Sequence, residues 1–140
     1  MVTLTRSQAL TSLIWVRFII GAISWFLPSV MARMMLIDAG ANPALAYALR
    51  LFGVRDVLMG VLIQAPQGDA LDQQLYISVA IDLIDVVASG TAGFTGHISK
   101  RAAILCCGAS LVGASLGAAS LGKGPLSRKA LAHRVKAIEG

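Results

Sequence analysis

Charged side chains are scarce in this sequence: they make up 14% of 140 residues, whereas soluble domains carry about 25%. Hydrophobic residues reach 56%, and the mean hydropathy is +0.75. This balance excludes an intrinsically disordered chain, because disorder requires low hydrophobicity and high charge. The composition therefore predicts a single-domain integral membrane protein that is embedded in the lipid bilayer.

Aromatic and cysteine residues are also few, and each shortage excludes a class of function. Aromatics make up 6% of the chain, which leaves few surfaces on which bases could stack, so the net charge of +5 does not indicate nucleic-acid binding. Cys106 and Cys107 are adjacent in an apolar run, so they cannot build a multi-bridge disulfide scaffold.

Recognisable metal and cofactor motifs are lacking as well. The sequence contains no Cys-x-x-Cys pair, no Gly-rich phosphate loop followed by Lys and no His-Glu-x-x-His. Its two histidines, His97 and His133, lie far apart in the chain. No nucleophile stands next to a base in any recognisable pattern. We therefore expect no metal, no cofactor and no enzymatic activity.

Four apolar runs are long enough to cross a bilayer, which takes about 20 residues at a rise of about 1.5 Å per residue. The first run ends before Pro28, and the second begins at Asn42-Pro43, a capping residue followed by a residue suited to the first helical turn. Asp69 and Asp72 are expected in a solvated turn between the second and third runs. The predicted spans are 8–27, 42–64, 75–94 and 102–122.

Two shorter segments have amphipathic patterns. Met31, Met34 and Met35 follow helical spacing and predict a short helix in the membrane interface after the first span. The basic segment 123–140 is either an amphipathic helix that meets anionic lipid headgroups or a solvated tail. Together these features predict an all-α integral membrane four-helix bundle over residues 1–122, followed by a basic cytoplasmic tail over residues 123–140.

The distribution of Lys and Arg in the flanks predicts the orientation of the chain. With an even number of spans, both termini lie on one side of the membrane, and that side holds six basic residues, Arg6 and five in the tail. The opposite side holds three, Arg33, Lys100 and Arg101. We therefore predict a multi-pass protein with its N-terminus and C-terminus in the cytoplasm.

Six charges fall inside the predicted spans, three positive and three negative. Left unpaired, they would cost on the order of 15 to 20 kcal/mol at insertion-scale values, which exceeds the stability of a typical domain. They must therefore meet in the interior of the bundle. We expect Arg55 to pair with Asp82 or Asp85, Arg17 to reach them from the inner side and Arg50 to contact Asp85 from the outer side. The six are Arg17, Arg50, Arg55, Asp56, Asp82 and Asp85.

Small and polar residues recur at helical spacing beside these charges. In the third span they form one stripe, Ser78, Asp82, Asp85, Ser89 and Gly93. This stripe has two interpretations: a buried clasp that fixes the register of the helices, or a pathway on which Asp82 or Asp85 takes up and releases a proton.

Glycines in the second and fourth spans allow close helix contacts. Gly53 and Gly60 share a face with Asp56, and Gly113 with Gly117 forms a GxxxG pair. The GxxxG face either packs on the first or third span of the same chain or forms an interface with a second copy or a partner subunit.

The run Arg50-Leu51-Phe52-Gly53-Val54-Arg55-Asp56, with the later Gly60 and the acidic pair Asp82 and Asp85, resembles a signature of small bacterial four-helix membrane proteins. These proteins are catalogued as a domain of unknown function in the DoxX-like neighbourhood. The resemblance covers residues 13–122 and implies a compact bundle in the bacterial inner membrane. DoxX-like relatives are discussed as partners of redox or respiratory systems, so the resemblance implies an accessory role and transfers no catalytic residue.

Two functions follow from the sequence. The first is a structural or accessory subunit of a larger membrane complex, which meets a membrane-protein partner or a second copy through the fourth span or the basic tail. The second is a small transporter or proton-coupled carrier that uses the polar stripe of the third span.

Overall fold

The computed structural model describes residues 5–38, 40, 42 and 44–121, and over this part of the chain all regular secondary structure is helical, with no strand. The helices are α1 (Arg6–Phe26), α2 (Pro28–Met34), α3 (Leu45–Gln64), α4 (Asp69–Phe94) and α5 (Lys100–Ser120).

Local sequence signals set the helix boundaries. Thr5 and Gln8 form a capping box at the start of α1. Pro28 occupies the first turn of α2, where a missing N–H costs nothing. The Ser99 hydroxyl accepts a hydrogen bond from the Ala102 N–H at the start of α5. Gly96, with φ of +79°, allows the tight reversal between α4 and α5.

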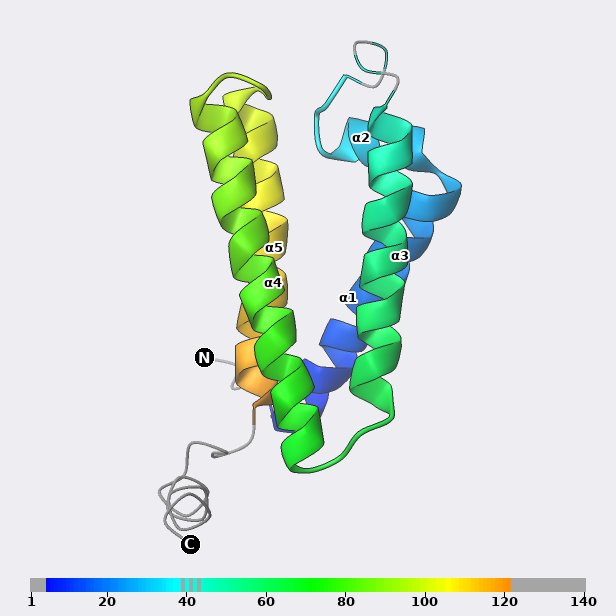
Figure 1. The fold of residues 1–140 in the computed structure, drawn as a ribbon, viewed down its shortest axis with the longest axis vertical. Helices are drawn as coiled ribbons and strands as arrows, with labels where there is room; N and C mark the ends of the chain where they lie inside the picture. The colour runs from blue at the N-terminus through cyan, green and yellow to red at the C-terminus, as the bar shows by residue number, and fades with distance from the viewer. Residues whose placement is uncertain (1–4, 39, 41, 43, 122–140) are drawn as a thin grey trace, which may run out of the picture.

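The helices pair as two hairpins (Figure 1). The first hairpin consists of α1 packed on α3, with α2 against both, and the second consists of α4 packed on α5. Contacts of α1 with α5 join the hairpins at the end where α3 turns into α4, and Figure 1 shows the hairpins separating toward α2 and the α4–α5 turn. The fold is therefore a V of two hairpins rather than four parallel helices closed around one axis.

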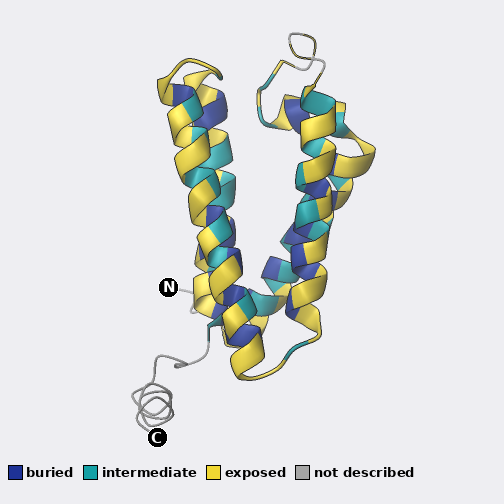
Figure 2. Cartoon of the chain, in the orientation of Figure 1, coloured by how far each residue is buried: buried dark blue, intermediate teal, exposed yellow. Residues whose placement is uncertain are grey.

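The apolar core lies at the joined end of the V. Leu13 of α1, Ile63 of α3 and Leu71 and Leu75 of α4 form one buried cluster. Figure 2 shows that the outward faces of the hairpins are largely exposed, and these faces carry large apolar side chains, of which Phe94 is 94% exposed. Exposed apolar surface around a partly polar interior is typical of a protein surrounded by lipid.

Three helices, α1, α4 and α5, are long and apolar enough to cross a membrane. α3 matches them in length, but any stretch of 18 residues within it contains Arg50, Arg55 and Asp56. Its own composition therefore does not identify it as a span. The all-α prediction is confirmed for the described residues, and the three apolar helices are compatible with a membrane protein. The four-helix membrane bundle and the crossing by α3 stay predictions.

Two local predictions differ from the structure. Asp69 and Asp72 lie in the first turn of α4 rather than in a loop, since this helix begins six residues before the predicted span. The three methionines do not form one face: Met31 is buried, Met35 is half-buried and Met34 is exposed, because α2 packs on both α1 and α3. The predicted tail helix lies outside the described residues.

Candidate functional site

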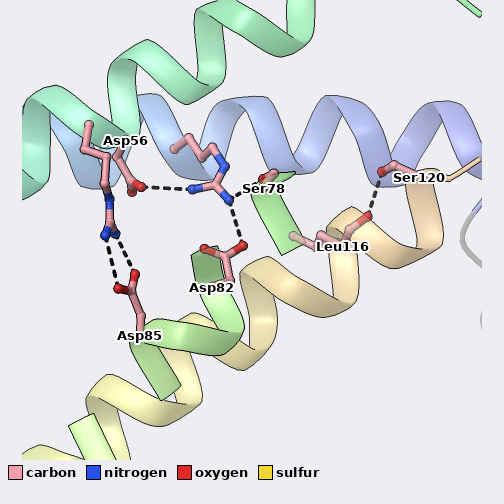
Figure 3. Close-up of polar contacts among 8 residues, drawn as sticks. Asp56, Ser78, Asp82, Asp85, Leu116 and Ser120 are labelled. Atoms are coloured by element: carbon pink, nitrogen blue, oxygen red, sulfur yellow. Dashed lines mark hydrogen bonds and ion pairs between the residues drawn. The ribbon is translucent and has the colours of Figure 1, made fainter. Parts of the chain in front are cut away.

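Arg17 is the centre of a buried polar site. It lies on the face of α1 that carries Gly21, and it is 3% exposed. Its guanidinium donates from Nη1 to Asp56 Oδ1 at 2.9 Å, and from Nη2 to Ser78 Oγ at 2.6 Å and Asp82 Oδ2 at 2.7 Å (Figure 3). Charge-assisted bonds of this kind are about twice as strong as neutral ones. One side chain thus connects α1, α3 and α4.

A second ion pair lies beside the first. Arg55 of α3 donates from Nη1 to Asp85 Oδ1 at 3.1 Å and from Nη2 to Asp85 Oδ2 at 2.6 Å, which is a two-pronged guanidinium–carboxylate pair (Figure 3). The Arg55 guanidinium also stands over the Phe52 ring, 4.7 Å from its centroid. The side chains of Arg55 and Asp85 are 35% and 23% exposed, so this ion pair is far less buried than the two ion pairs of Arg17.

We call these six residues the clasp, because two of their ion pairs cross between the hairpins. Arg17–Asp82 and Arg55–Asp85 both link the first hairpin to α4, whereas Arg17–Asp56 stays within the first hairpin. Two guanidinium groups therefore face three carboxylates, and the clasp carries one excess negative charge when every group is ionised. Its members are Arg17, Arg55, Asp56, Ser78, Asp82 and Asp85.

The structure brings together five of the six charges singled out in the sequence. The expected contact of Arg55 with the acidic pair is made to Asp85, and Asp82 contacts Arg17 instead. The expected contact of Arg50 with Asp85 is wrong: Arg50 is exposed, and its guanidinium makes no ion pair with any described residue. Arg50 and Arg55 are five positions apart in the chain, which places the two side chains about 140° apart around the helix.

A further ion pair, between an exposed arginine and a buried aspartate, was missed in the sequence. Asp72 is 5% exposed, and it accepts a hydrogen bond from Arg6 Nη2 at 2.7 Å, while Arg6 Nε donates to the Ser120 carbonyl oxygen at 2.8 Å. Asp72 had been expected in a turn. Helical spacing gave no signal for it, because Asp72 lies six positions before Ser78, which places the two side chains about 120° apart around α4.

Glycines bring the helices close enough for these contacts. A Cβ atom built at Gly53 would lie 2.6 Å from the Gly21 carbonyl oxygen, so the backbones of α1 and α3 touch there. At Gly60 it would lie 3.3 Å from the Phe18 ring. Only glycine permits the first of these approaches without a shift of backbone.

The GxxxG pair of α5 is used within the chain. A Cβ atom at Gly113 would lie 2.8 Å from Asp82 Oδ2, and one at Gly117 would lie 2.7 Å from Val79 Cγ2. Both neighbours belong to α4. This face therefore packs on the third predicted span, and it is not available as the interface that was the alternative prediction.

Two adjoining cavities lie between the hairpins. The smaller, about 50 Å³, is lined by Arg17 and by all three carboxylates of the clasp. The larger, about 290 Å³, is lined mainly by apolar side chains of α2 to α5 and reaches Asp85. We call the two cavities the groove, since their walls share Met35, Phe52, Asp85, Ala109 and Ser110. The groove therefore leads from the open side of the V to the clasp.

The described residues contain no group of three or more His, Cys, Asp or Glu side chains arranged to hold a metal ion. Comparisons with known proteins do not identify the chain either: no family model matches it, and no curated protein or solved structure shows significant similarity to it. The DoxX-like resemblance stays an expectation, and the function has to be argued from the clasp and the groove.

Proposed function

We propose that the protein is a small integral membrane carrier, in which the two hairpins part and close around the groove. The observation that supports this proposal is the position of the groove, which ends on the ion pairs that join the hairpins. A ligand in the groove would therefore contact the polar link that sets the distance between the hairpins.

The two halves of the clasp differ in a way that suits this role. Arg17 holds Asp56 and Asp82 in a buried site beside the core, where separating the charges is costly. The Arg55–Asp85 pair is only partly buried, and Asp85 lines both cavities of the groove. The outer pair can exchange partners while the inner pair keeps the hairpins joined, which would leave the joined end of the V as a hinge.

Energetic magnitudes agree with such a motion. An exposed ion pair contributes about 0 to 1 kcal/mol, and breaking a fully buried one costs about 3 to 5 kcal/mol. The partly buried Arg55–Asp85 pair falls between these limits. Conformers that interconvert during function differ in free energy by a few kcal/mol. The free energy of ligand binding is therefore large enough to open this ion pair.

Distance measurements between two spin labels test the motion. The first pair is placed at the open end of the V, at Tyr47→Cys on α3 and Phe94→Cys on α4, both exposed positions. The matched pair is placed at the joined end, at Leu62→Cys and Gln73→Cys. Cys106 and Cys107 are replaced by Ala in both proteins, which are reconstituted in lipid nanodiscs.

A carrier predicts two populations of distances for the open-end pair and a single one for the joined-end pair. In the Asp85→Asn background the more open population should grow, because one of the ion pairs between the hairpins is weakened. A single narrow open-end distance that Asp85→Asn leaves unchanged would refute the carrier and favour the clasp as a purely structural device.

The accessory-subunit hypothesis names the fourth span as its first support, and other faces of α5 stay free for such a contact: the GxxxG face contacts α4 of the same chain, whereas Ile104 and Val112 are exposed. Its other support, the basic tail, lies outside the described residues. It stays a prediction, and its test is whether the native protein purifies from its membrane with a stoichiometric partner.

A further inference from the structure

We propose that the groove binds an amphipathic monovalent cation, a molecule with a single positive charge on an apolar body. Its charged group would contact Asp85 and the Phe52 ring, and its apolar part would lie against α2 and α5. This inference rests on the proposed function, because it names the substrate class of the same groove.

The charge of the site favours a cation. The charged residues in the walls of the two cavities are Arg17, Asp56, Asp82 and Asp85, and Arg55 is bonded to Asp85. Each carboxylate has an arginine partner, but Arg17 serves two of them, so these five residues carry one net negative charge when every group is ionised. An uncompensated charge is expensive in a low-dielectric interior, so a monovalent cation in the groove would balance the clasp, and an anion would add to the imbalance.

Asp85 has the capacity to accept this cation without losing Arg55. A carboxylate offers about four lone-pair positions, and Arg55 uses one bond on each oxygen of Asp85. The side chain keeps 23% of its exposure and lines both cavities. A positively charged group could therefore approach from the groove while the ion pair persists or loosens.

The remaining wall fits the rest of such a molecule. Phe52 lines both cavities, and its ring already holds the Arg55 guanidinium 4.7 Å from its centroid. The site is therefore suited to a cation, and an ammonium group that reaches the ring would compete with Arg55 for it. Met31 and Met35 supply flexible side chains that adapt to different apolar shapes. Besides Asp85, the described residues that line the larger cavity include few polar groups, the hydroxyls of Ser89 and Ser110 and the Cys106 thiol. A cavity of about 290 Å³ with few polar groups suits a small amphipathic ligand.

Equilibrium dialysis of radiolabelled benzyltrimethylammonium against the purified full chain in nonionic detergent tests the inference. We expect saturable binding that Asp85→Asn weakens at least tenfold, because the variant removes the carboxylate charge and keeps the size of the side chain. The matched control is Asp69→Asn, an exposed carboxylate at the start of α4 away from the groove, which should bind within twofold of the wild type.

Two further measurements keep the test decisive. Ala88→Phe narrows the larger cavity without changing any charge, so it should reduce binding even if Asp85→Asn does not fold. Competition with molecules of similar size should separate charge from apolarity: unlabelled benzyltrimethylammonium should displace the probe, whereas phenylacetate and benzyl alcohol should not. Circular dichroism and gel filtration establish that each variant is folded.

Equal binding by the wild type and by folded Asp85→Asn would overturn the inference. Equal competition by phenylacetate or benzyl alcohol would also overturn it, because the groove would then be an unselective apolar site for lipid or detergent. Unchanged binding by folded Ala88→Phe would also overturn it. Binding with a single spin-label distance would sustain the cation site and refute the carrier. Two distances without binding would sustain the carrier and refute this substrate class.

Discussion

Replacing Arg17 by methionine should destabilise the protein more than any other single neutralisation in the clasp. Arg17→Met keeps an unbranched side chain in the same space but removes every hydrogen bond to Asp56, Ser78 and Asp82. The two carboxylates are 4% and 5% exposed, so neither can turn to solvent. Breaking a buried ion pair in this way costs about 3 to 5 kcal/mol. We expect one such loss rather than two, because both carboxylates share one guanidinium.

A triple variant separates the cost of leaving the Asp56 and Asp82 carboxylates unpaired from the cost of lost side-chain packing. In the triple variant Arg17→Met, Asp56→Asn, Asp82→Asn the buried site carries no charge, so the penalty for unpaired carboxylates disappears. Replacing a whole buried ionic group is often neutral or stabilising. The triple variant should therefore be more stable than Arg17→Met alone, although it lacks two further native groups.

Stability can be measured as the free energy of unfolding from nonionic micelles on titration with sodium dodecyl sulfate, followed by the helical circular dichroism signal. The control is Arg50→Met, which removes an exposed guanidinium from α3 and should change stability by less than about 0.5 kcal/mol. The reasoning is refuted if Arg17→Met is as stable as Arg50→Met, or if the triple variant is no more stable than Arg17→Met.

Two more predictions concern packing and topology. Gly53→Ala places a Cβ atom within 2.6 Å of a backbone oxygen of α1, so it should lower the free energy of unfolding by about 1 to 3 kcal/mol. At Gly108 an added Cβ atom has nothing within 4 Å, so Gly108→Ala should raise that free energy by about 0.5 to 1 kcal/mol. The same unfolding titration compares the two variants, and equal effects would contradict the contact between α1 and α3. For topology, a membrane-impermeant maleimide on intact cells should label His97→Cys but not Gln67→Cys, with Cys106 and Cys107 replaced by Ala; the reverse pattern would overturn the predicted orientation.

Residue spacing along one helix predicted part of the clasp but not its ion pairs. Asp82 and Asp85 lie three residues apart, so the sequence requires them to share a face of α4. It also requires buried partners for them, since unpaired charges in a membrane are costly. The partner of each carboxylate could not be derived, because that depends on the rotation and depth of α1 and α3 relative to α4. Arg50 and Arg55 are both within reach along the chain, yet only Arg55 faces Asp85.

The amino-acid sequence was enough to predict that the chain is helical and apolar, where most of its helices begin and end, and that its interior charges must be compensated. These properties follow from composition, capping residues and helical periodicity, which act over one or two turns. Three features could be seen only in the folded molecule: the helices form a V of two hairpins, α4 occupies the GxxxG face of α5, and the groove ends on Asp85. Those features depend on which faces of distant helices meet, and that choice is made by packing and charge pairing across the whole molecule.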